Sequence, residues 1–435
     1  MLKKTITIII AALMICSMAA CGSSDNKKDS GSSSGTSSSA SGNTDSSSDN
    51  GSSAASDTSS DNSSSSVSDT STAAQGTEVK AEYTPNTNGL LTTTDIFSNR
   101  DLLQTPELSN ATKVQASDGK TETITEEGIY ILTGTANNFT VKVEAAKDAK
   151  VQLVLDNFNI TNESTPVIYV VSADKCFVTT SGNESKLSVT GEFTADGDSN
   201  TDAVIYSKDD IVLNGTGTLT ISSSDNGISG KDTIKITGGT YNITTTKDSI
   251  EAKDSILICG GTFNINTSKD GLHCENSDDD SLGYIYIYGG SFKITAKADA
   301  IQTQSAVQID GGTFDITASE GIEATYVQIN DGTISISASD DGINASSKSK
   351  AYSTPTFEMN GGTLTIVMGQ GDTDAIDANG NIVVNGGKID ITAQVSSFDY
   401  DGTAEFNGGT IIINGSQVDS IPHSMMGGGR GGMMR

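Results

Sequence analysis

Apolar and polar residues alternate in short runs along most of the chain, and these runs return in the same order. The stretches GGTFNIN from Gly260, GGSFKIT from Gly289 and GGTFDIT from Gly311 differ at only a few positions. The residue after each glycine pair recurs about every 22 residues, with some longer intervals. A period of this length indicates a solenoid built from stacked repeats.

Each repeat contains three alternating runs and no apolar spacing typical of a helix. In one repeat, Ile256, Phe263 and Leu272 belong to the inward-facing positions of the three runs. Coils stacked about 4.8 Å apart would align such residues into apolar columns. We therefore predict an all-β fold, a parallel β-helix with three strands per coil and three sheets. The period does not fix the handedness, but right-handed crossovers are the general expectation.

The N-terminal part of the chain has a different composition. Residues 1–20 combine Lys3 and Lys4 with a short apolar run and small residues, which is the layout of a secretory signal. The run that ends at Cys21 resembles a bacterial lipobox, so we expect Cys21 to become the lipid-modified first residue. The alternative is an ordinary cleaved signal with a chance cysteine. The Ser, Gly and Asp residues that follow cannot form a core and predict a disordered tether.

The solenoid itself needs a cover at its open end, because an exposed sheet edge invites aggregation. Residues 92–109, TTTDIFSNRDLLQTPELS, hold the dense non-repeating apolar residues near its start, and we predict that they form this cover. The predicted regions are a lipoprotein signal peptide at 1–20, a tether at 21–83, an N-terminal cap at 84–119, a parallel β-helix at 120–423 and a flexible Gly/Met-rich tail at 424–435.

The formal net charge of −29 excludes some classes of partner. Nucleic acids and anionic membrane surfaces require clustered Lys and Arg, which this chain lacks. Beyond Cys21 the cysteines are Cys176, Cys259 and Cys274, so at most one disulfide can form among them. We expect a monomer that touches the membrane only through its lipid anchor, on the outer surface of a bacterial cell.

Carboxylates recur at two positions around the third run of each repeat. One stands two residues before the inward aliphatic residue and the other one residue after it, so stacking would form two adjacent acidic columns. Carboxylates about 5 Å apart repel one another unless a cation neutralises them. Ca²⁺ binds six to eight such oxygen donors, and we predict calcium on this edge. The alternative is a solvated edge of turn-forming residues. The candidate ligands are Asp248, Glu251, Asp270, Asp299, Glu320, Glu323, Asp341, Asp374, Asp377, Asp399 and Asp401.

Three tyrosines alternate in the run GYIYIYGG, residues 283–290. Tyr284, Tyr286 and Tyr288 would face outward from one strand, and a sugar ring can stack on such side chains. The alternative is that they cover neighbouring apolar residues such as Leu257.

Several motifs occur in a fixed order before the repeats: IFSNRDLLQT, EEGIYILTGT, VQLVLDNFNIT and PVIYVVSADK. Together with the GGTF-type coils and the Gly/Met tail, they resemble a family of bacterial surface carbohydrate-binding domains. This family is related to clostridial calcium-dependent, polygalacturonate- and cellulose-binding β-helix proteins, and the resemblance covers about residues 95–420. It implies a right-handed, pectate-lyase-like fold, bound Ca²⁺ and an acidic plant polysaccharide as partner.

Two other classes of function stay open at this point. A calcium-dependent pectate-lyase-like enzyme would need a base, for which Lys247 or Lys269 is available. A self-associating surface adhesin would need no glycan ligand. The hydrolase class is disfavoured, since the segments NTD at 200–202 and DDG at 340–342 lie several coils apart. We favour a non-catalytic protein that binds polygalacturonate or pectin, with cellulose as a second target.

Overall fold

The computed structural model describes residues 79–371 and 373–422, which belong to the unit Thr77–Arg435. These residues form 36 strands and contain no helix. Within this part of the chain there is accordingly no helix that could cross a membrane. The predicted signal peptide, Cys21, most of the predicted tether and the predicted tail lie outside the described residues.

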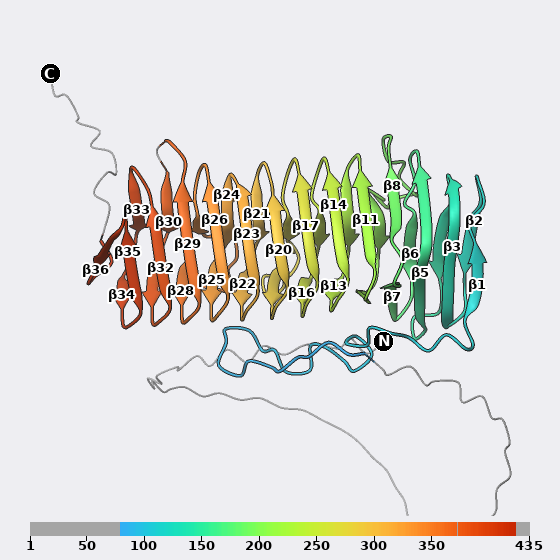
Figure 1. Ribbon diagram of the computed structural model, residues 1–435, viewed down its shortest axis with the longest axis horizontal. Coiled ribbons are helices and arrows are strands. Elements are labelled where there is room, and N and C mark those ends of the chain that lie inside the picture. Colours follow the sequence, from blue (N-terminus) through green and yellow to red (C-terminus); the bar gives the residue numbers. More distant parts are fainter. Residues whose placement is uncertain (1–78, 372, 423–435) are drawn as a thin grey trace, which may run out of the picture. The chain divides into compact units, whose positions relative to one another are not determined.

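Most coils contribute one strand to each of three ladders, and each strand pairs in parallel with its counterpart in the next coil (Figure 1). The first ladder consists of β7 (Lys175–Thr180), β10 (Ile211–Gly215), β13 (Thr233–Ile236), β16 (Ser255–Ile258), β19 (Tyr284–Ile287), β22 (Ala306–Ile309), β25 (Tyr326–Ile329), β28 (Thr356–Met359), β31 (Asn381–Val384) and β34 (Ala404–Phe406).

The second ladder follows the first after a tight turn. It consists of β8 (Ser185–Val189), β11 (Thr218–Ser223), β14 (Thr240–Thr245), β17 (Thr262–Thr267), β20 (Ser291–Thr295), β23 (Thr313–Ala318), β26 (Thr333–Ala338), β29 (Thr363–Met368), β32 (Lys388–Thr392) and β35 (Thr410–Ile413).

The third ladder completes each coil and carries the acidic positions singled out above. It consists of β2 (Thr121–Ile124), β4 (Thr140–Glu144), β6 (Ile168–Ser172), β9 (Ala203–Ser207), β12 (Asn226–Gly230), β15 (Ile250–Ala252), β18 (Leu272–Cys274), β21 (Asp299–Thr303), β24 (Glu320–Ala324), β27 (Ile343–Ala345), β30 (Asp374–Ala378) and β33 (Ser396–Tyr400).

The ladders belong to two hydrogen-bonded sheets, whereas the sequence predicted three. The third ladder is a sheet of 12 strands, and the first two ladders share a sheet of 24 strands. The reason is the length of β3 (Gly128–Asn137) and β5 (Lys150–Asn162), because β5 pairs with both β7 and β8. The same sheet includes β1 (Thr112–Gln115) and β36 (Ser416–Val418), and β36 pairs antiparallel with β35. The handedness of the coils stays a prediction.

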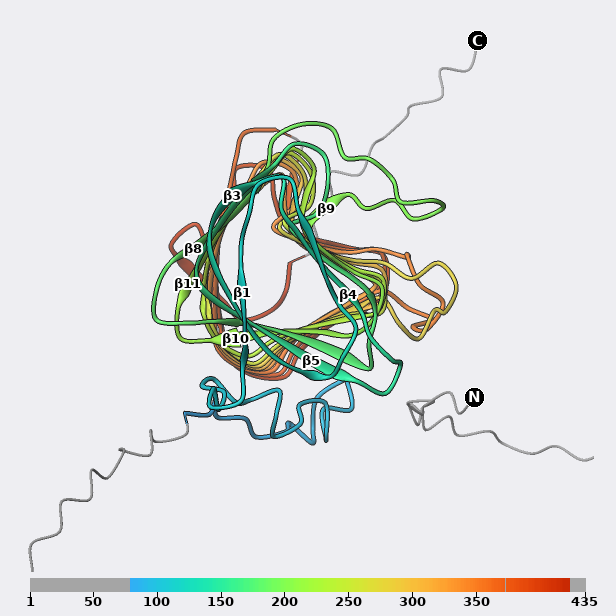
Figure 2. The ribbon, with the colours of Figure 1, turned by 90° about the vertical axis from the view of Figure 1, so that its right-hand side faces the viewer.

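Seen along the solenoid, the ladders surround a common interior (Figure 2). Buried apolar side chains fill it as columns of like residues. The rings of Phe263, Phe292 and Phe314 stack with centroids 4.6 and 4.5 Å apart, which confirms the predicted inward column. From β14 onward, a glycine with positive φ precedes each second-ladder strand and makes the turn possible: Gly261 has a φ of 122°, a region that L-residues avoid. Cys176, Cys259 and Cys274 are buried and free, so packing rather than a disulfide holds the described coils together.

Residues 79–109, which we call the flanking segment, do not cap the N-terminal coil as the sequence predicted. They run along the outside of the first ladder (Figures 1 and 2). The solenoid therefore begins at β1, within the range predicted to be the cap. The physical reason is that the apolar residues of the segment pack on a strip of the first ladder around Leu257, Cys259 and Tyr286.

A buried ion pair fastens the flanking segment to the ladder. The Asp101 carboxylate is 0% exposed and lies 3.0 Å from Lys175 Nζ and 3.4 Å from Lys235 Nζ. Burial raises the pKa of Asp101, but the two ammonium groups outweigh it and the pKa is lowered. Lys235 also donates to the carbonyl oxygen of Ile96, and the backbone N–H of Ser98 donates to Asp101.

Replacing Asp101 by Ala should loosen the flanking segment, because it leaves two partly buried lysines without their carboxylate. Breaking a buried pair costs about 3 kcal/mol, so we expect a lower melting temperature and faster proteolytic cleavage within residues 79–109. Glu122→Ala is the control, since its pair with Lys120 is exposed and such pairs contribute less than about 1 kcal/mol. Equal protease resistance of both variants would contradict the fastening role.

Candidate functional site

The acidic edge of the third ladder is organised by bonds between coils. The Asp248 carboxylate accepts the backbone N–H of Asp270 at 3.1 Å, and the Asp270 carboxylate accepts that of Asp299 at 3.0 Å. Asp341 accepts the N–H of Asp374 in the same way at 3.2 Å. These three corner carboxylates thus each satisfy a backbone donor of the following coil, a structural role that the spacing alone did not reveal.

Two groups on this edge bring three potential metal ligands together. The first, which we call the lysine-paired group, consists of Asp248, Asp270 and His273, and the second, which we call the carboxylate group, consists of Asp299, Glu320 and Glu323. In each group the ligand atoms lie within 4.8 Å of one another.

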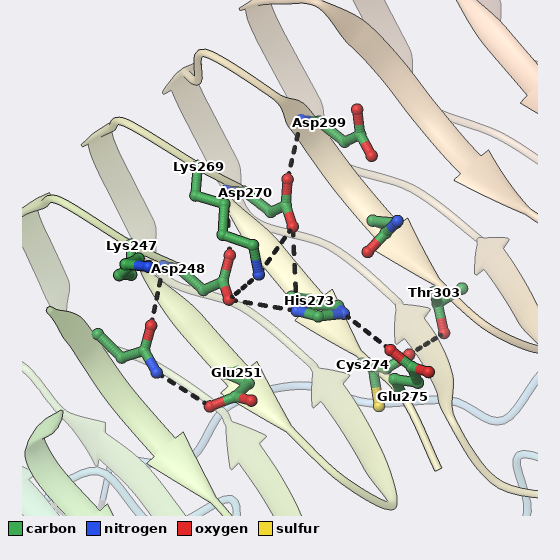
Figure 3. A network of polar contacts seen from close by, with 12 residues as sticks. Lys247, Asp248, Glu251, Lys269, Asp270, His273, Cys274, Glu275, Asp299 and Thr303 are labelled. Carbon is green, nitrogen blue, oxygen red and sulfur yellow. Dashed lines mark hydrogen bonds and ion pairs between the residues drawn. The ribbon is translucent and has the colours of Figure 1, made fainter. Parts of the chain in front are cut away.

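The lysine-paired group carries its own cations (Figure 3). Lys269 Nζ lies 2.7 Å from Asp248 and 3.6 Å from Asp270, and Nδ1 of His273 lies 3.2 Å from Asp248. Burial opposes ionisation of Asp248, but His273 and Lys269 outweigh it and hold its pKa at about 2. Burial also opposes the charge on His273, yet its bond to Asp248 raises the pKa. A metal ion here would have to displace an ammonium group already in place.

In the carboxylate group, far less positive charge offsets the negative charge of the carboxylates. Burial, followed by repulsion from Glu320, Asp270 and Glu323, raises the pKa of Asp299 to about 8. Burial and repulsion from Glu323 raise the pKa of Glu320 to about 7. Lys348 contacts this group through Glu323, with Nζ 2.5 Å from its carboxylate. These groups crowd more negative charge than the site neutralises.

A hard cation such as Ca²⁺ fits the carboxylate group. Asn344 donates through Nδ2 to Glu320 at 3.0 Å, while its amide Oδ1 is buried without a hydrogen-bond partner. A buried, unsatisfied acceptor is costly, and a cation is one partner that would satisfy it. Three carboxylates and one amide oxygen are all donors of the type that Ca²⁺ prefers.

The other predicted ligands lie on the same ladder but do not complete such a group among the described residues. Glu251 instead accepts from Asn226 and Ser229. Burial, with repulsion from neighbouring carboxylates, raises the pKa of Asp341 to about 7 and that of Asp377 to about 6. Toward the C-terminal coils, β30 begins at Asp374 and has Asp377 as its fourth residue. Asp399 pairs in register with Asp377, and Asp401 is exposed.

The predicted tyrosine face is covered. Tyr286 is 0% exposed and donates to Asp310 at 2.8 Å, and the ring of Tyr288 lies 5.0 Å from that of Tyr83. Tyr284 and Tyr288 pack against the same cluster, which includes Leu257. The tyrosines therefore bind the flanking segment and do not present a platform to a sugar, in line with the alternative reading that they cover apolar neighbours.

A pocket of about 260 Å³ lies beside the two metal-ligand groups, and the residue spacing did not predict it. It is lined by His273, Glu275, Gln302, Gln304 and Lys348. Two insertions between strands, residues 275–283 and 346–355, contact one another through a bond from Ser349 Oγ to the carbonyl oxygen of Asp280, 2.9 Å long. In the sequence, these two insertions are visible only as intervals between repeats that are longer than 22 residues.

Comparison with known proteins identifies the family. A family model described as carbohydrate-binding domain-containing protein matches residues 118–375 and 322–420. The chain belongs to this carbohydrate-binding domain family. A relative in Acetivibrio thermocellus with the same description is 44% identical over 202 residues, which cover 46% of this chain and 70% of the relative.

One solved structure is also similar to this carbohydrate-binding domain protein. It is described as the gadolinium derivative of the polysaccharide lyase-like protein from C. thermocellum, with 31% identity and a TM-score of 0.46. The match covers 52% of this chain and 96% of the other. Both metal-ligand groups and the pocket lie within the residues that the carbohydrate-binding family model matches.

The raised pKa values predict how stability depends on pH when divalent cations are removed. Folded Asp299 and Glu320 hold protons up to about pH 8 and about pH 7, where the unfolded chain has already lost them. The free energy of unfolding should therefore fall as the pH rises from about 4 to about 8. Asp248 acts in the opposite sense, since its contribution is lost as the pH falls toward 2.

In a chelator, the melting temperature should thus be higher at pH 5 than at pH 8. Asp299→Asn should reduce this difference, because it removes the carboxyl group with the most strongly raised pKa of the pair. A melting temperature that rises between pH 5 and pH 8 would contradict the charge crowding described here.

Proposed function

We propose that the protein binds an acidic plant-type polysaccharide, such as polygalacturonate or pectin, through Ca²⁺ on the acidic edge of a right-handed, pectate-lyase-like solenoid. The observation that carries this proposal is the carboxylate group of Asp299, Glu320 and Glu323, which is crowded, partly buried and adjacent to a polar pocket. Membership of the carbohydrate-binding domain family supports a glycan as ligand.

Calcium is central to this proposal because of charge. The chain carries a formal net charge of −29, and a polyuronate that approached the bare edge would be repelled. Asp299, Glu320 and Glu323 would hold the ion, with the Asn344 amide oxygen as a further donor. When bound, Ca²⁺ would neutralise these groups and offer its remaining coordination positions to a sugar carboxylate.

The pocket supplies the complementary polar groups. The amide of Gln302 already donates to Glu323 at 3.1 Å and that of Gln304 accepts the N–H of Asn276 at 2.8 Å. Each amide has further capacity to donate to and accept from sugar hydroxyl groups. His273 and Lys348 are the cationic groups of the lining, and they lie on the sides of the lysine-paired group and the carboxylate group, respectively. Neutral sugars such as those of cellulose could use the amides, while an acidic sugar would also use the cations.

Lyase chemistry is less well supported by the geometry. Burial opposes the charge on Lys269, but its bond to Asp248 outweighs this and raises the pKa, so the ammonium group holds its proton. A base for proton abstraction needs the opposite shift. Lys247 is exposed, and its described contacts do not orient it toward the pocket. We therefore propose binding without catalysis.

Glu320→Gln combined with Glu323→Gln tests the binding mode, since it keeps the shape of the edge and removes two charges. We expect at least tenfold weaker calcium binding in calorimetry, a loss of about 1.4 kcal/mol, and loss of calcium-dependent retention on polygalacturonate. Asp315→Asn is the matched control, because Asp315 is exposed on the second ladder of the same coil.

Several outcomes would redirect the proposal. Equal calcium and polygalacturonate binding by the double variant and the control would show that this edge is an ordinary solvated corner. Binding to no glycan on an array, with or without calcium, would favour the adhesin class. Ultraviolet-absorbing unsaturated products that disappear in Lys269→Ala would favour the lyase.

We also propose that the protein is an extracellular monomer, anchored to the bacterial membrane by a lipid on Cys21. The basis is the lipobox-like sequence before Cys21, since this residue lies outside the described structure. Cys21→Ser should move the protein from the membrane fraction to the soluble fraction, because a lipid chain would be its anchor. Unchanged membrane retention would argue against lipidation.

A further inference from the structure

Each metal-ligand group spans two coils, and the two groups follow one another along the third ladder but differ in their cations. His273 of β18 pairs in register with Gln302 of β21. Lys269, two positions before Gly271, is followed one coil later by Ala298, whose N–H donates to the Lys269 carbonyl oxygen. From the coil of β18 to that of β21 the corner carboxylate is retained as Asp299, while Ala298 and Gln302 stand where Lys269 and His273 stood, and the following coil adds Glu320 and Glu323 without a new cation of its own.

Lys348 replaces them from another part of the chain. It comes from the insertion between β27 and β28, and its Nζ lies 2.5 Å from the Glu323 carboxylate. Its backbone is fixed, because the N–H groups of Lys348 and Ser349 donate to Thr325 Oγ1 at 3.0 and 2.8 Å. Its side chain remains 29% exposed and lines the pocket, whereas the Glu323 side chain is only 10% exposed.

Resting on the function proposed above, we propose that Lys348 is an internal counter-ion that a divalent cation displaces from Glu323. The displaced ammonium group then serves the pocket as the binding partner of a sugar carboxylate. Binding of the divalent cation and binding of the acidic glycan are thereby coupled through one side chain. The Lys348 ammonium group becomes available to the glycan only when the divalent cation neutralises the carboxylate group.

Charge balance favours this exchange. One ammonium group cannot neutralise Asp299, Glu320 and Glu323 together, whereas a divalent ion brings twice the charge. Once such an ion is present, like charges repel and Glu323 attracts the ammonium group less. The flexible four-carbon stem of lysine permits the movement without a change in the backbone, and the pocket that receives it already contains the amides of Gln302 and Gln304.

Lys348→Met tests both halves of the proposal, because Met keeps much of the length and removes the charge. With Ca²⁺ alone, calorimetry should give about tenfold tighter binding than the parent, since a competing cation is gone. At saturating Ca²⁺, trigalacturonate should bind about tenfold more weakly. In a chelator at pH 8 the melting temperature should fall, because the carboxylate group has lost its counter-ion.

Two control variants test whether the effects come from the position and charge of Lys348. Lys350→Met changes an exposed lysine of the same insertion and should behave as the parent in all three measurements. Lys348→Arg keeps the charge and should retain trigalacturonate binding, which excludes misfolding of the insertion as the cause of a loss.

The failures are distinguishable. If the parent binds neither Ca²⁺ nor trigalacturonate, the proposed function fails and this inference falls with it. If the parent binds both but Lys348→Met leaves calcium affinity unchanged, the counter-ion role is wrong while the proposed function stands. If calcium affinity rises and trigalacturonate binding is unaffected, the pocket role of Lys348 is wrong.

Discussion

Parallel pairing in strict register is the constraint on which the rest of this molecule depends. Within the ladders, a residue lies beside the residue that occupies the same position in the next coil, about 4.8 Å away. For apolar positions this is favourable, as in the stack of Phe263, Phe292 and Phe314. For charged positions it is unfavourable, because the same repetition places Asp299 beside Glu320. The fold thus gains its core and its charge crowding from a single geometric rule.

The described coils compensate for this crowding in three ways. Corner carboxylates accept backbone N–H groups of the following coil, Lys269 and His273 neutralise Asp248, and Lys348 reaches Glu323 from an insertion. The first two are parts of the repeat, whereas the third is added from outside it. The site that we propose for a cation and a glycan lies in the coils that have no counterpart of Lys269 and His273 to neutralise their carboxylates.

Features that follow from the period could be predicted from the sequence. The inward Phe column and the pairing of Glu320 with Glu323 at one corner were both readable from residue spacing alone. Features made by non-repeating residues could not. Tyr286 lies between the inward-facing Ile285 and Ile287, at a position where an exposed residue is expected. It is nevertheless buried by a segment almost 200 positions earlier in the chain, and no local pattern encodes that contact. The pocket escaped prediction for the same reason, because Lys348 reaches it from an insertion whose path the period does not determine.

The bonds from corner carboxylates to the next coil have a consequence for how such a protein can evolve. The Asp248 carboxylate accepts the N–H of Asp270, and the Asp270 carboxylate accepts that of Asp299, so these coils each carry an acceptor for the following coil within their own sequence. If one of these coils were duplicated, the new coil would bring its own acceptor for the N–H of the coil that follows. It would lengthen the acidic edge while the bonds of the neighbouring coils stayed in place. Gene segments that encode whole coils are natural units of inheritance in this architecture, and the number of ligand positions can grow by copying, with no need to build a new site.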